Sequence, residues 1–290
     1  MQNLVAKADV LIEALPYIQR FRGATVVIKF GGSAMEQRTC YDGILTDVVF
    51  MECVGINPVI VHGGGSAVTR RLKEAGIRSD FVGGLRVTTE EMIRLVDEVL
   101  TEQVNPGIVE TLRQHGGRAV GIAGREVLRA RRLRPLNPEG TERLDLGLVG
   151  EVENVDCRPI DAALADESVP VISPLGRQPD GQVLNINADN AAAEVAIAMR
   201  ARKLVFLSDV PGVMKDPEDK ESFLSTLRVG EVAELTQSGG VAGGMMPKVS
   251  AAVRALELGV QKVHIIDGRQ PHSLLLEIFT NRGVGTEIVP

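Results

Sequence analysis

Three glycine-rich segments, two of them with a lysine close by, carry the clearest chemical signal in the sequence. They are Lys29-Phe-Gly-Gly-Ser33, His62-Gly-Gly-Gly-Ser66 and the stretch from Gly239 to Lys248. Glycine lets backbone N–H groups approach an anion closely, and the N-terminus of a following helix adds a favourable dipole. One glycine pair after a strand would most simply be a tight turn. Three such segments in one chain favour a binding site for phosphate groups.

The motifs of several other enzyme classes are missing. The sequence contains no GxxxxGK[ST] loop, no HExxH zinc motif and no GxSxG nucleophile turn, and it has only four histidines. Lysines, glycine amides and carboxylates remain, a set that suits phosphoryl transfer, which depends on positioning and charge neutralisation. A carboxylate acceptor would already be ionised at neutral pH and would need no general base. The product would then be an acyl phosphate. We expect Mg²⁺ to arrive with the nucleotide, so no dedicated metal site of the protein is predicted.

Composition and charge exclude further classes. The chain has 290 residues, 44% of them hydrophobic and 24% charged, as in globular proteins, so disorder is excluded. A net charge of −6 and 3% aromatic residues argue against nucleic-acid binding. The five arginines between Arg125 and Arg134 therefore favour a solvated projecting segment over a nucleic-acid surface. No apolar run approaches the roughly 18 residues of a membrane span. Three scattered cysteines, Cys40, Cys53 and Cys157, favour a cytoplasmic location.

The elements that must position these groups alternate between two patterns. Longer segments with helical periodicity separate short apolar runs, which suit the strands of a covered parallel sheet. The pattern predicts an α/β fold, a three-layer αβα sandwich with a mainly parallel central sheet. The six predicted strands are Thr25–Phe30, Pro58–His62, Arg118–Ile122, Val169–Ser173, Leu204–Ser208 and Lys262–Ile266.

Several segments have local signatures of their own. Thr88-Thr-Glu-Glu91 predicts a capping box at a helix start, and Pro247 suits the first turn of another helix. Residues 125–152 are predicted to be strands and loops that project from the sheet, and residues 209–225 a loop over a ligand site. Before the first strand, an amphipathic helix is expected, with an apolar stripe of Leu4, Ala8, Leu11, Leu15 and Ile18. Periodicity alone would most simply make this helix a cap on the core.

The order of the motifs resembles the amino acid kinase family, and within it the N-acetyl-L-glutamate kinases of arginine biosynthesis. The resemblance runs from about residue 25 to the C-terminus. It implies three parts: residues 1–22 for oligomerisation, 23–180 for binding the acyl amino acid and for dimerisation, and 181–290 for binding ATP. The motifs that carry it are Lys29-Phe-Gly-Gly, His62-Gly-Gly-Gly, Gly84-Leu-Arg-Val-Thr88, Asn185-Ile-Asn-Ala-Asp189, Leu207-Ser-Asp-Val-Pro-Gly212 and Gly243-Gly-Met-Met-Pro-Lys248.

This resemblance implies a catalytic role for three residues. In the family, lysines at the positions of Lys29 and Lys248 stabilise the transferring phosphoryl group from opposite sides, and a carboxylate at the position of Asp189 holds them. Without the resemblance, Lys248 would most simply be a surface charge, and Asp189 an acid favoured by the dipole of a helix N-terminus. For Lys29 a surface position is disfavoured, because apolar Val27, Ile28 and Phe30 flank it and suggest a buried strand end. The implied reaction is ATP-dependent phosphorylation of N-acetyl-L-glutamate.

Further positions match the family's binding sites. The acyl amino acid would contact Gly64, Gly65, Arg86 and Asn185, with Arg86 as a bidentate clamp on a carboxylate. The simpler interpretations are turns for the glycines and for Asn185, and a surface ion pair for Arg86. ATP would lie near Gly31, Gly32, Ser208, Asp209, Gly243 and Gly244.

The tail of the sequence resembles arginine-inhibited members of the family. His264, Glu277 and Gly283 match positions tied there to inhibition by L-arginine, although a surface salt bridge is the ordinary role of a residue such as Glu277. In those members an N-terminal helix interlaces dimers into a hexamer, so the expected assembly is a homo-oligomer, a dimer or a trimer of dimers. A regulatory signalling protein is a possible further partner.

Two alternative functions remain open from the sequence. The first is a related kinase that acts on a capped aminoadipate in lysine biosynthesis. The second is a catalytically silent amino-acid sensor with the same fold. Retention of Lys29, Asp189 and Lys248 argues against the silent sensor, because a pure binding protein would not need all three.

Overall fold

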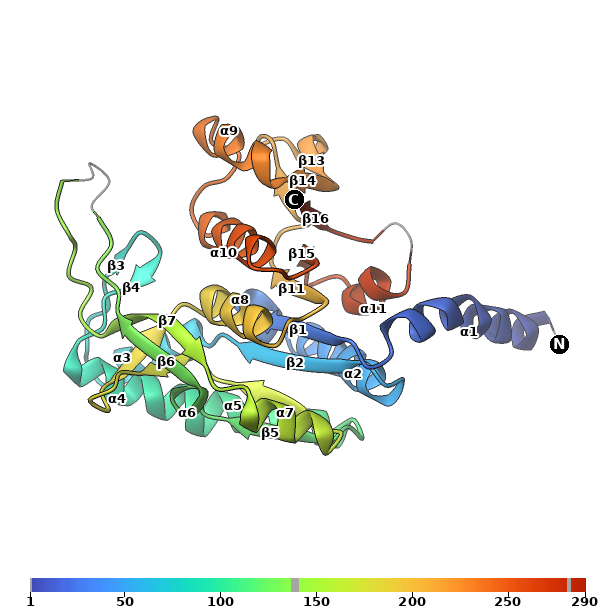
Figure 1. The fold of residues 1–290 in the computed structure, drawn as a ribbon, viewed down its shortest axis with the longest axis horizontal. Coiled ribbons are helices and arrows are strands. Elements are labelled where there is room, and N and C mark those ends of the chain that lie inside the picture. Colours follow the sequence, from blue (N-terminus) through green and yellow to red (C-terminus); the bar gives the residue numbers. More distant parts are fainter. Residues whose placement is uncertain (1, 137–140, 281–282) are drawn as a thin grey trace.

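The computed structural model describes residues 2–136, 141–280 and 283–290. Eight strands form its central sheet (Figure 1). All neighbouring pairs are parallel except β15 and β16, so the predicted mainly parallel sheet is confirmed. All six predicted strands occur in this sheet. In spatial order its strands are β14 (Thr226–Arg228), β16 (Thr286–Val289), β15 (Lys262–Asp267), β11 (Lys203–Ser208), β1 (Thr25–Phe30), β2 (Asn57–His62), β8 (Val169–Ile172) and β5 (Ala119–Ile122).

Helices cover both faces of the sheet because its central strands are apolar on both sides. In β1, Val26, Ile28 and Phe30 pack toward one helical layer, whereas Val27 packs toward the other. The predicted three-layer sandwich is therefore confirmed. The first layer contains α2 (Arg38–Cys53), α5 (Asn105–Gln114) and α11 (Ser273–Ile278). The second contains α3 (Gly65–Glu74), α4 (Glu90–Asp97), α8 (Ala188–Ala198) and α10 (Met245–Glu257).

The predicted helix start at residues 88–91 is wrong by one residue. Helix α4 is capped by Thr89, whose hydroxyl accepts the backbone N–H of Met92 at 3.3 Å. Thr88 has other partners: its hydroxyl donates to the carbonyl of Arg86 at 3.0 Å and accepts the Asn185 amide at 3.1 Å, and its backbone N–H donates to Leu146. By contrast, the prediction for Pro247 is confirmed, because this residue lies in the first turn of α10.

Between α4 and α5 the chain forms a π-helical segment, η2 (Glu98–Val104). The sequence pattern did not predict this segment. It brings Leu100 against the second glycine cluster, at the place where a side chain at Gly64 would lie. A π-helical turn inside a longer helix often occurs at a functional site.

Residues 125–152 contribute to a small closed barrel of four strands next to the sheet (Figure 1). The predicted strands and loops are present, although a short helix, α6, begins the segment. Residues 133–136 and 141–148 extend away from the barrel at the left of Figure 1, where the β3–β4 hairpin also lies. The elements of this part are α6 (Gly124–Val127), β6 (Leu128–Arg132), β7 (Val149–Val155), β9 (Leu175–Arg177), β10 (Val183–Ile186), β3 (Phe81–Val82) and β4 (Leu85–Arg86).

The predicted loop at residues 209–225 is mostly irregular but contains a two-stranded hairpin, β12 with β13. The remaining short elements lie between the main strands and helices. They are η1 (Gly32–Met35), α7 (Arg158–Ala165), β12 (Val213–Met214), η3 (Lys220–Ser222), β13 (Phe223–Leu224), η4 (Val229–Glu231) and α9 (Val232–Gln237).

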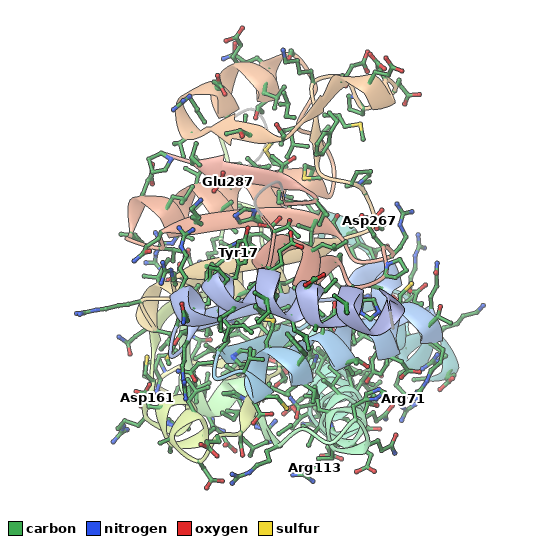
Figure 2. The ribbon with its side chains drawn as sticks, turned by 90° about the vertical axis from the view of Figure 1, so that its right-hand side faces the viewer. Tyr17, Arg71, Arg113, Asp161, Asp267 and Glu287 are labelled. Atoms are coloured by element: carbon green, nitrogen blue, oxygen red, sulfur yellow. The ribbon has the colours of Figure 1, made fainter. Side chains whose placement is uncertain are left out.

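Helix α1 (Gln2–Phe21) extends away from the body of the molecule (Figure 1). Its last residue, Phe21, is buried, but Val10, Leu11 and Ile12 are 63%, 66% and 67% exposed. The helix is therefore not the cap on the core that periodicity alone would suggest. Figure 2 views the molecule from this side, with Tyr17 of α1 in front and Glu287 of β16 above it. None of the described helices is both long and apolar enough to cross a membrane.

Candidate active site

A cleft of about 830 Å³ opens at the carboxyl ends of β1 and β2. In parallel α/β sheets, this edge is where ligands bind. The cleft is lined by Lys29, Gly32, Gly64, Gly65, Arg86, Asn185 and Asp189. Leu100 and Val104 of the π-helical segment η2 also line it. Residues predicted from four separate motifs therefore meet in one place.

One carboxylate joins the two predicted catalytic lysines. Asp189 Oδ1 lies 3.1 Å from the Nζ of Lys29, and Asp189 Oδ2 lies 3.1 Å from the Nζ of Lys248. Helix α8 holds Asp189 in its first turn, because the side chain of Asn187 caps the helix and accepts the backbone N–H of Asp189 at 2.9 Å. We call Lys29, Asp189 and Lys248 the open cluster, since Lys29 and Asp189 line the cleft.

The electrostatics of the open cluster favour an anionic ligand. Burial alone would raise the pKa of Asp189, but Lys29 and Lys248 outweigh it and lower that pKa below its usual value. The carboxylate therefore stays ionised, and two ammonium groups with one carboxylate leave a surplus of one positive charge. Helices α8 and α10 both begin at this place, so their N-terminal dipoles add to the same field.

The glycines allow two backbone loops to meet beside these charges. A Cβ atom at Gly31 would lie 2.9 Å from the Nζ of Lys29, and one at Gly63 would lie 3.3 Å from the Cα of Gly31. Gly64 has a φ of +148°, and a Cβ there would lie 2.6 Å from a methyl group of Leu100. In the described part of the chain, no group accepts the backbone N–H of Gly64. That donor is available for a ligand.

Arg86 presents an uncompensated charge at the other end of the cleft. Its guanidinium donates to Ser79 Oγ, to Thr69 Oγ1 at 2.7 Å and to the carbonyl of Gly65 at 3.1 Å. It also lies 4.6 Å from the ring centre of Phe81. Burial lowers the pKa of Arg86, yet an arginine stays charged in proteins. No described carboxylate pairs with it, so the acid of a ligand fits here.

Asn185 approaches the cleft from β10 and is tied to Thr88. The Asn185 amide donates to Thr88 Oγ1 at 3.1 Å, and that hydroxyl in turn donates to the Arg86 carbonyl at 3.0 Å. Thr88 is completely buried and joins two predicted binding residues. The sequence analysis noted Thr88 only as part of a motif and as a helix cap, so its role in linking these residues was missed.

The predicted nucleotide residues are only partly in the cleft. Gly32 lines it and Gly31 packs against Lys29, whereas Ser208, Asp209, Gly243 and Gly244 are not among its lining residues. Ser208 ends β11, the strand next to β1, so it lies at the same edge of the sheet. Helix α10 begins just after Gly244, whose carbonyl lies 3.5 Å from the Nζ of Lys248. These residues therefore continue the site beyond the cleft.

A second cluster contains the residues predicted to respond to arginine. Glu277 Oε1 lies 2.9 Å from the Nζ of Lys203 and 2.7 Å from the Nδ1 of His264. Glu277 Oε2 accepts the backbone N–H of Val284 at 3.2 Å, and a Cβ atom at Gly283 would lie 2.6 Å from it. The structure therefore brings all three predicted residues together. We call Lys203, His264 and Glu277 the closed cluster, because all three side chains are buried.

Lys203 was missed by the sequence analysis, since a lysine at the start of a strand looks like an ordinary surface residue. Burial opposes the ionisation of Glu277, but His264 and Lys203 outweigh it and lower its pKa to about 2. The Nζ of Lys203 also lies 5.7 Å from the ring centre of Phe21, at the end of α1. The closed cluster therefore adjoins the base of the N-terminal helix.

Among the described residues, no group of three or more histidine, cysteine, aspartate or glutamate side chains could hold a metal ion. The donors of the open cluster are of a different kind, since two of its three residues are cations. They suit the phosphate oxygens of a nucleotide, which can carry Mg²⁺ with it.

Comparisons with known proteins identify the family of this chain. Residues 24–267 match the model of the amino acid kinase family. The chain is 48% identical over 288 residues to the acetylglutamate kinase of Moorella thermoacetica, with 98% of this chain and 97% of that protein covered. It is 46% identical to the acetylglutamate kinase of Carboxydothermus hydrogenoformans, with both chains covered completely.

Solved structures with the same fold include the N-acetylglutamate synthase of Neisseria gonorrhoeae in complex with coenzyme A and N-acetyl-glutamate. The TM-score is 0.84 at 28% identity, and the match covers 98% of this chain but only 63% of the synthase chain. The same synthase in complex with coenzyme A and L-arginine gives a TM-score of 0.79 at 27% identity and covers 97% of this chain and 65% of the synthase.

Proposed function

The chain belongs to the amino acid kinase family and is a kinase, and we propose that it transfers the γ-phosphoryl group of ATP to the side-chain carboxylate of N-acetyl-L-glutamate. The product is N-acetyl-L-glutamyl 5-phosphate, an intermediate of arginine biosynthesis. The observation that carries the proposal is the cleft in which the open cluster faces the unpaired guanidinium of Arg86. The curated relatives that match over nearly their whole length support the same acceptor.

The substrate would be held by its charged and polar groups. Arg86 would take the α-carboxylate, and the backbone amides of Gly64 and Gly65 and the side chain of Asn185 would take the acyl amino acid along the cleft. Its γ-carboxylate has an ordinary pKa of about 4.3 and is ionised at neutral pH, so it attacks without a general base. This agrees with a cleft that offers cations rather than a proton acceptor.

The open cluster would act on the transferring phosphoryl group. In a loose transition state, charge stays on the three peripheral oxygens, and Lys29 and Lys248 would neutralise it from two sides. Asp189 would keep both ammonium groups in place before the substrate arrives, so little reorganisation is needed during the reaction. The nucleotide itself would extend over Gly31, Gly32, Ser208, Asp209, Gly243 and Gly244, with Mg²⁺ on its phosphates.

The decisive experiment traps the product. With ATP, N-acetyl-L-glutamate and hydroxylamine, an acyl phosphate is converted to a coloured hydroxamate. We expect hydroxamate with N-acetyl-L-glutamate and much less with N-acetyl-L-aminoadipate, the acceptor of the lysine-pathway alternative. Hydroxamate formation only with the longer acceptor would favour that alternative. No hydroxamate with either acceptor would favour the silent sensor.

We further propose that L-arginine inhibits the enzyme through the closed cluster in a ring of three dimers. Two observations support this proposal. Exposed Val10, Leu11 and Ile12 leave α1 with an apolar surface that a second copy could cover. The related synthase structure contains bound L-arginine. Because Glu277 is already paired on both oxygens, arginine could gain it as a partner only by rearranging the cluster.

This proposal has its own test. Millimolar arginine should inhibit the full chain, and deletion of residues 1–20 should give dimers that respond weakly. Sedimentation and activity are measured on the same preparations. Full activity of the intact chain in saturating arginine would refute the regulation, and a hexameric truncated form would refute the role of the helix.

A further inference from the structure

His62 begins the second glycine cluster but has no role in the proposed reaction. It is the last residue of β2, its side chain is completely buried, and burial lowers its pKa to about 4. The histidine is therefore neutral at physiological pH, and one of its two ring nitrogens carries the only proton. The position of this proton decides whether His62 can donate a hydrogen bond to the backbone of the glycines that follow.

Asn105 settles the tautomer of this ring. The side-chain nitrogen of Asn105 lies 2.8 Å from the carbonyl oxygen of Val171 and 3.2 Å from the Nε2 of His62. A carbonyl oxygen can only accept, so the atom that faces Val171 must be the amide nitrogen. This nitrogen has two protons and donates the second to Nε2, which must then be the unprotonated nitrogen. The proton of His62 is on Nδ1.

Asn105 has little freedom to turn over. A Cβ atom at Gly121 would lie 2.2 Å from the Oδ1 of Asn105, so the absence of a side chain on β5 makes room for this amide. Asn105 is the first residue of α5, directly after the π-helical segment that packs on Gly64. The orientation of the amide is thus fixed by the strand beside it as well as by its hydrogen bonds.

The protonated Nδ1 of His62 donates to the carbonyl oxygen of Gly63 at 2.6 Å, and among the residues that the structure describes it has no other acceptor. In a trans peptide the C=O and the following N–H point in opposite directions. Because the carbonyl of Gly63 is directed at the buried ring, the N–H of Gly64 must point away from it. Gly64 lines the cleft, and within the described chain no group accepts its N–H.

The other side of this loop is fixed as well. The backbone N–H of Gly63 donates to the carbonyl of Phe30 at 2.6 Å, which ties the glycine cluster to the end of β1. Rotation of the peptide between Gly63 and Gly64 is therefore opposed mainly by the bond to His62. Loss of that bond would let the amide of Gly64 turn without unfolding the strand.

We propose that His62, held in its Nδ1–H tautomer by Asn105, is a positioning residue that directs the Gly64 amide to the point where the γ-carboxylate of the bound acyl amino acid meets the transferring phosphoryl group. This inference rests on the proposed function for the place where the phosphoryl group lies. A preorganised backbone donor at such a position typically contributes a factor of about 10² to 10³ to the rate, and misdirection of the donor loses part of it.

Two substitutions separate the two ring nitrogens. In His62→Asn the side-chain amide nitrogen can replace Nδ1 and still donate to Gly63. In His62→Gln the longer side chain can reach Asn105 but leaves the Gly63 carbonyl without its donor. We expect kcat to fall about 30-fold in His62→Gln with little change in KM, and to recover to within about threefold of the wild type in His62→Asn.

The exposed His115 provides the matched control, because His115→Gln makes the same change far from the glycine cluster. Asn105→Asp supplies a variant that keeps His62, since an aspartate would accept from Nε2 and move the proton away from Nδ1. We expect its kcat to fall as in His62→Gln. Equal losses in His62→Gln and His62→Asn, or normal kcat in Asn105→Asp, would overturn the proposal.

Two further measurements do not depend on the acceptor substrate. Nitrogen-15 NMR of the four histidines should find one ring in the Nδ1–H form that does not titrate between pH 5.5 and 8 and is lost in His62→Asn. Calorimetry should find that His62→Gln weakens the binding of AMP-PNP about tenfold relative to ADP. A wild type that makes no hydroxamate would refute the proposed acceptor only. An Nε2–H ring, or an unchanged nucleotide preference, would refute the role of His62.

Discussion

The open and closed clusters lie at opposite ends of neighbouring parallel strands, and each combines two basic side chains with one carboxylate. Lys203, at the start of β11, is paired in register with Val26, whereas Lys29 is paired with Phe206. The two lysines are thus separated by three residues along the strands, or about 10 Å of rise. The residue types of the two clusters are nearly the same, and their surroundings differ.

The difference between the clusters is surplus charge and access. In the open cluster, Asp189 has one lysine on each oxygen, one positive charge is left over, and the cleft admits an anion. In the closed cluster, Lys203 and His264 both contact the same oxygen of Glu277, and burial lowers the pKa of His264 despite the neighbouring Glu277, which disfavours a second positive charge there. Similar residues therefore form an accessible, positively charged group at one end of the sheet and a buried internal contact at the other.

The largest effect is expected from removing a charge of the open cluster. Lys29→Met or Lys248→Met keeps most of the side-chain volume but removes a cation placed for the transition state. We expect kcat to fall about 10² to 10³-fold, because a preorganised charged donor contributes that much. Lys73→Met, on the exposed part of α3, is the control and should behave as the wild type. A kcat near normal in either variant would remove that lysine from the reaction.

Replacing the carboxylate of each cluster by an amide should lower the free energy of unfolding by different amounts. Glu277→Gln leaves Lys203 buried without a counter-charge, and breaking a buried pair costs about 3 kcal/mol or more. Asp189→Asn should cost less, because water in the cleft can solvate Lys29, and the side chain of Lys248 is itself 16% exposed. Urea unfolding of both variants measures the free energies. A larger loss in Asp189→Asn would show that access to water does not distinguish the clusters.

The pH dependence of the free energy of unfolding of Glu277→Gln tests whether ionised Glu277 stabilises the fold. The pKa of Glu277 is about 2 in the folded protein against an ordinary 4.5, so its ionised form stabilises the fold above pH 4.5. This contribution is lost as the pH falls from 4.5 toward 2. The stability difference between the wild type and Glu277→Gln should therefore shrink over that range, as followed by urea unfolding at each pH.

The sequence predicted the open cluster far better than the closed one. Lys29 lies near the end of an apolar strand beside two glycines, so the pattern itself favours a buried position for it, and the resemblance of the ordered motifs added Asp189 and Lys248. The sheet was predictable for the same reason, because its strands are continuous apolar runs. Features that are encoded in a local stretch of sequence could therefore be predicted.

The features that the sequence did not predict depend on contacts between distant segments. Lys203 has the pattern of a surface lysine, and only Glu277, 74 residues away, makes it an internal one. Thr89, rather than Thr88, caps α4, and the hydroxyl of Thr88 accepts from Asn185, 97 residues away, instead of from the helix. The π-helical turn at Glu98–Val104 has no sequence signature that separates it from an ordinary helix. Tertiary competition, rather than local preference, decided each case.

A smaller effect is expected at the other charge of the cleft. Arg86→Lys keeps the positive charge but loses the planar fork that donates to three oxygens and stacks near Phe81. We expect KM for N-acetyl-L-glutamate to rise about tenfold, with KM for ATP changed less than twofold. Initial rates with each substrate varied in turn measure both constants. An equal rise in both would argue against Arg86 as a carboxylate clamp.

The smallest effect is expected from alanine at a glycine beside each cluster, Gly31 or Gly283. The pair tests whether the side chains of the closed cluster are less able to move than those of the open cluster. A Cβ at Gly31 would lie 2.9 Å from the Nζ of Lys29, the movable end of a side chain that borders the cleft, and Gly31 does not have a positive φ. A Cβ at Gly283 would lie 2.6 Å from Glu277 Oε2, and Gly283 has a φ of +60°.

In Gly31→Ala the lysine can yield toward the cleft, so we expect the free energy of unfolding to change little while kcat falls because Lys29 is displaced. In Gly283→Ala the carboxylate cannot yield, since Lys203, His264 and the N–H of Val284 all hold it. Adding the penalty of a left-handed alanine, we expect a loss of about 1 kcal/mol in stability. Thermal unfolding and kcat of both variants decide the matter. If Gly283→Ala unfolds like the wild type, the carboxylate can move after all, and the closed cluster is as adaptable as the open one.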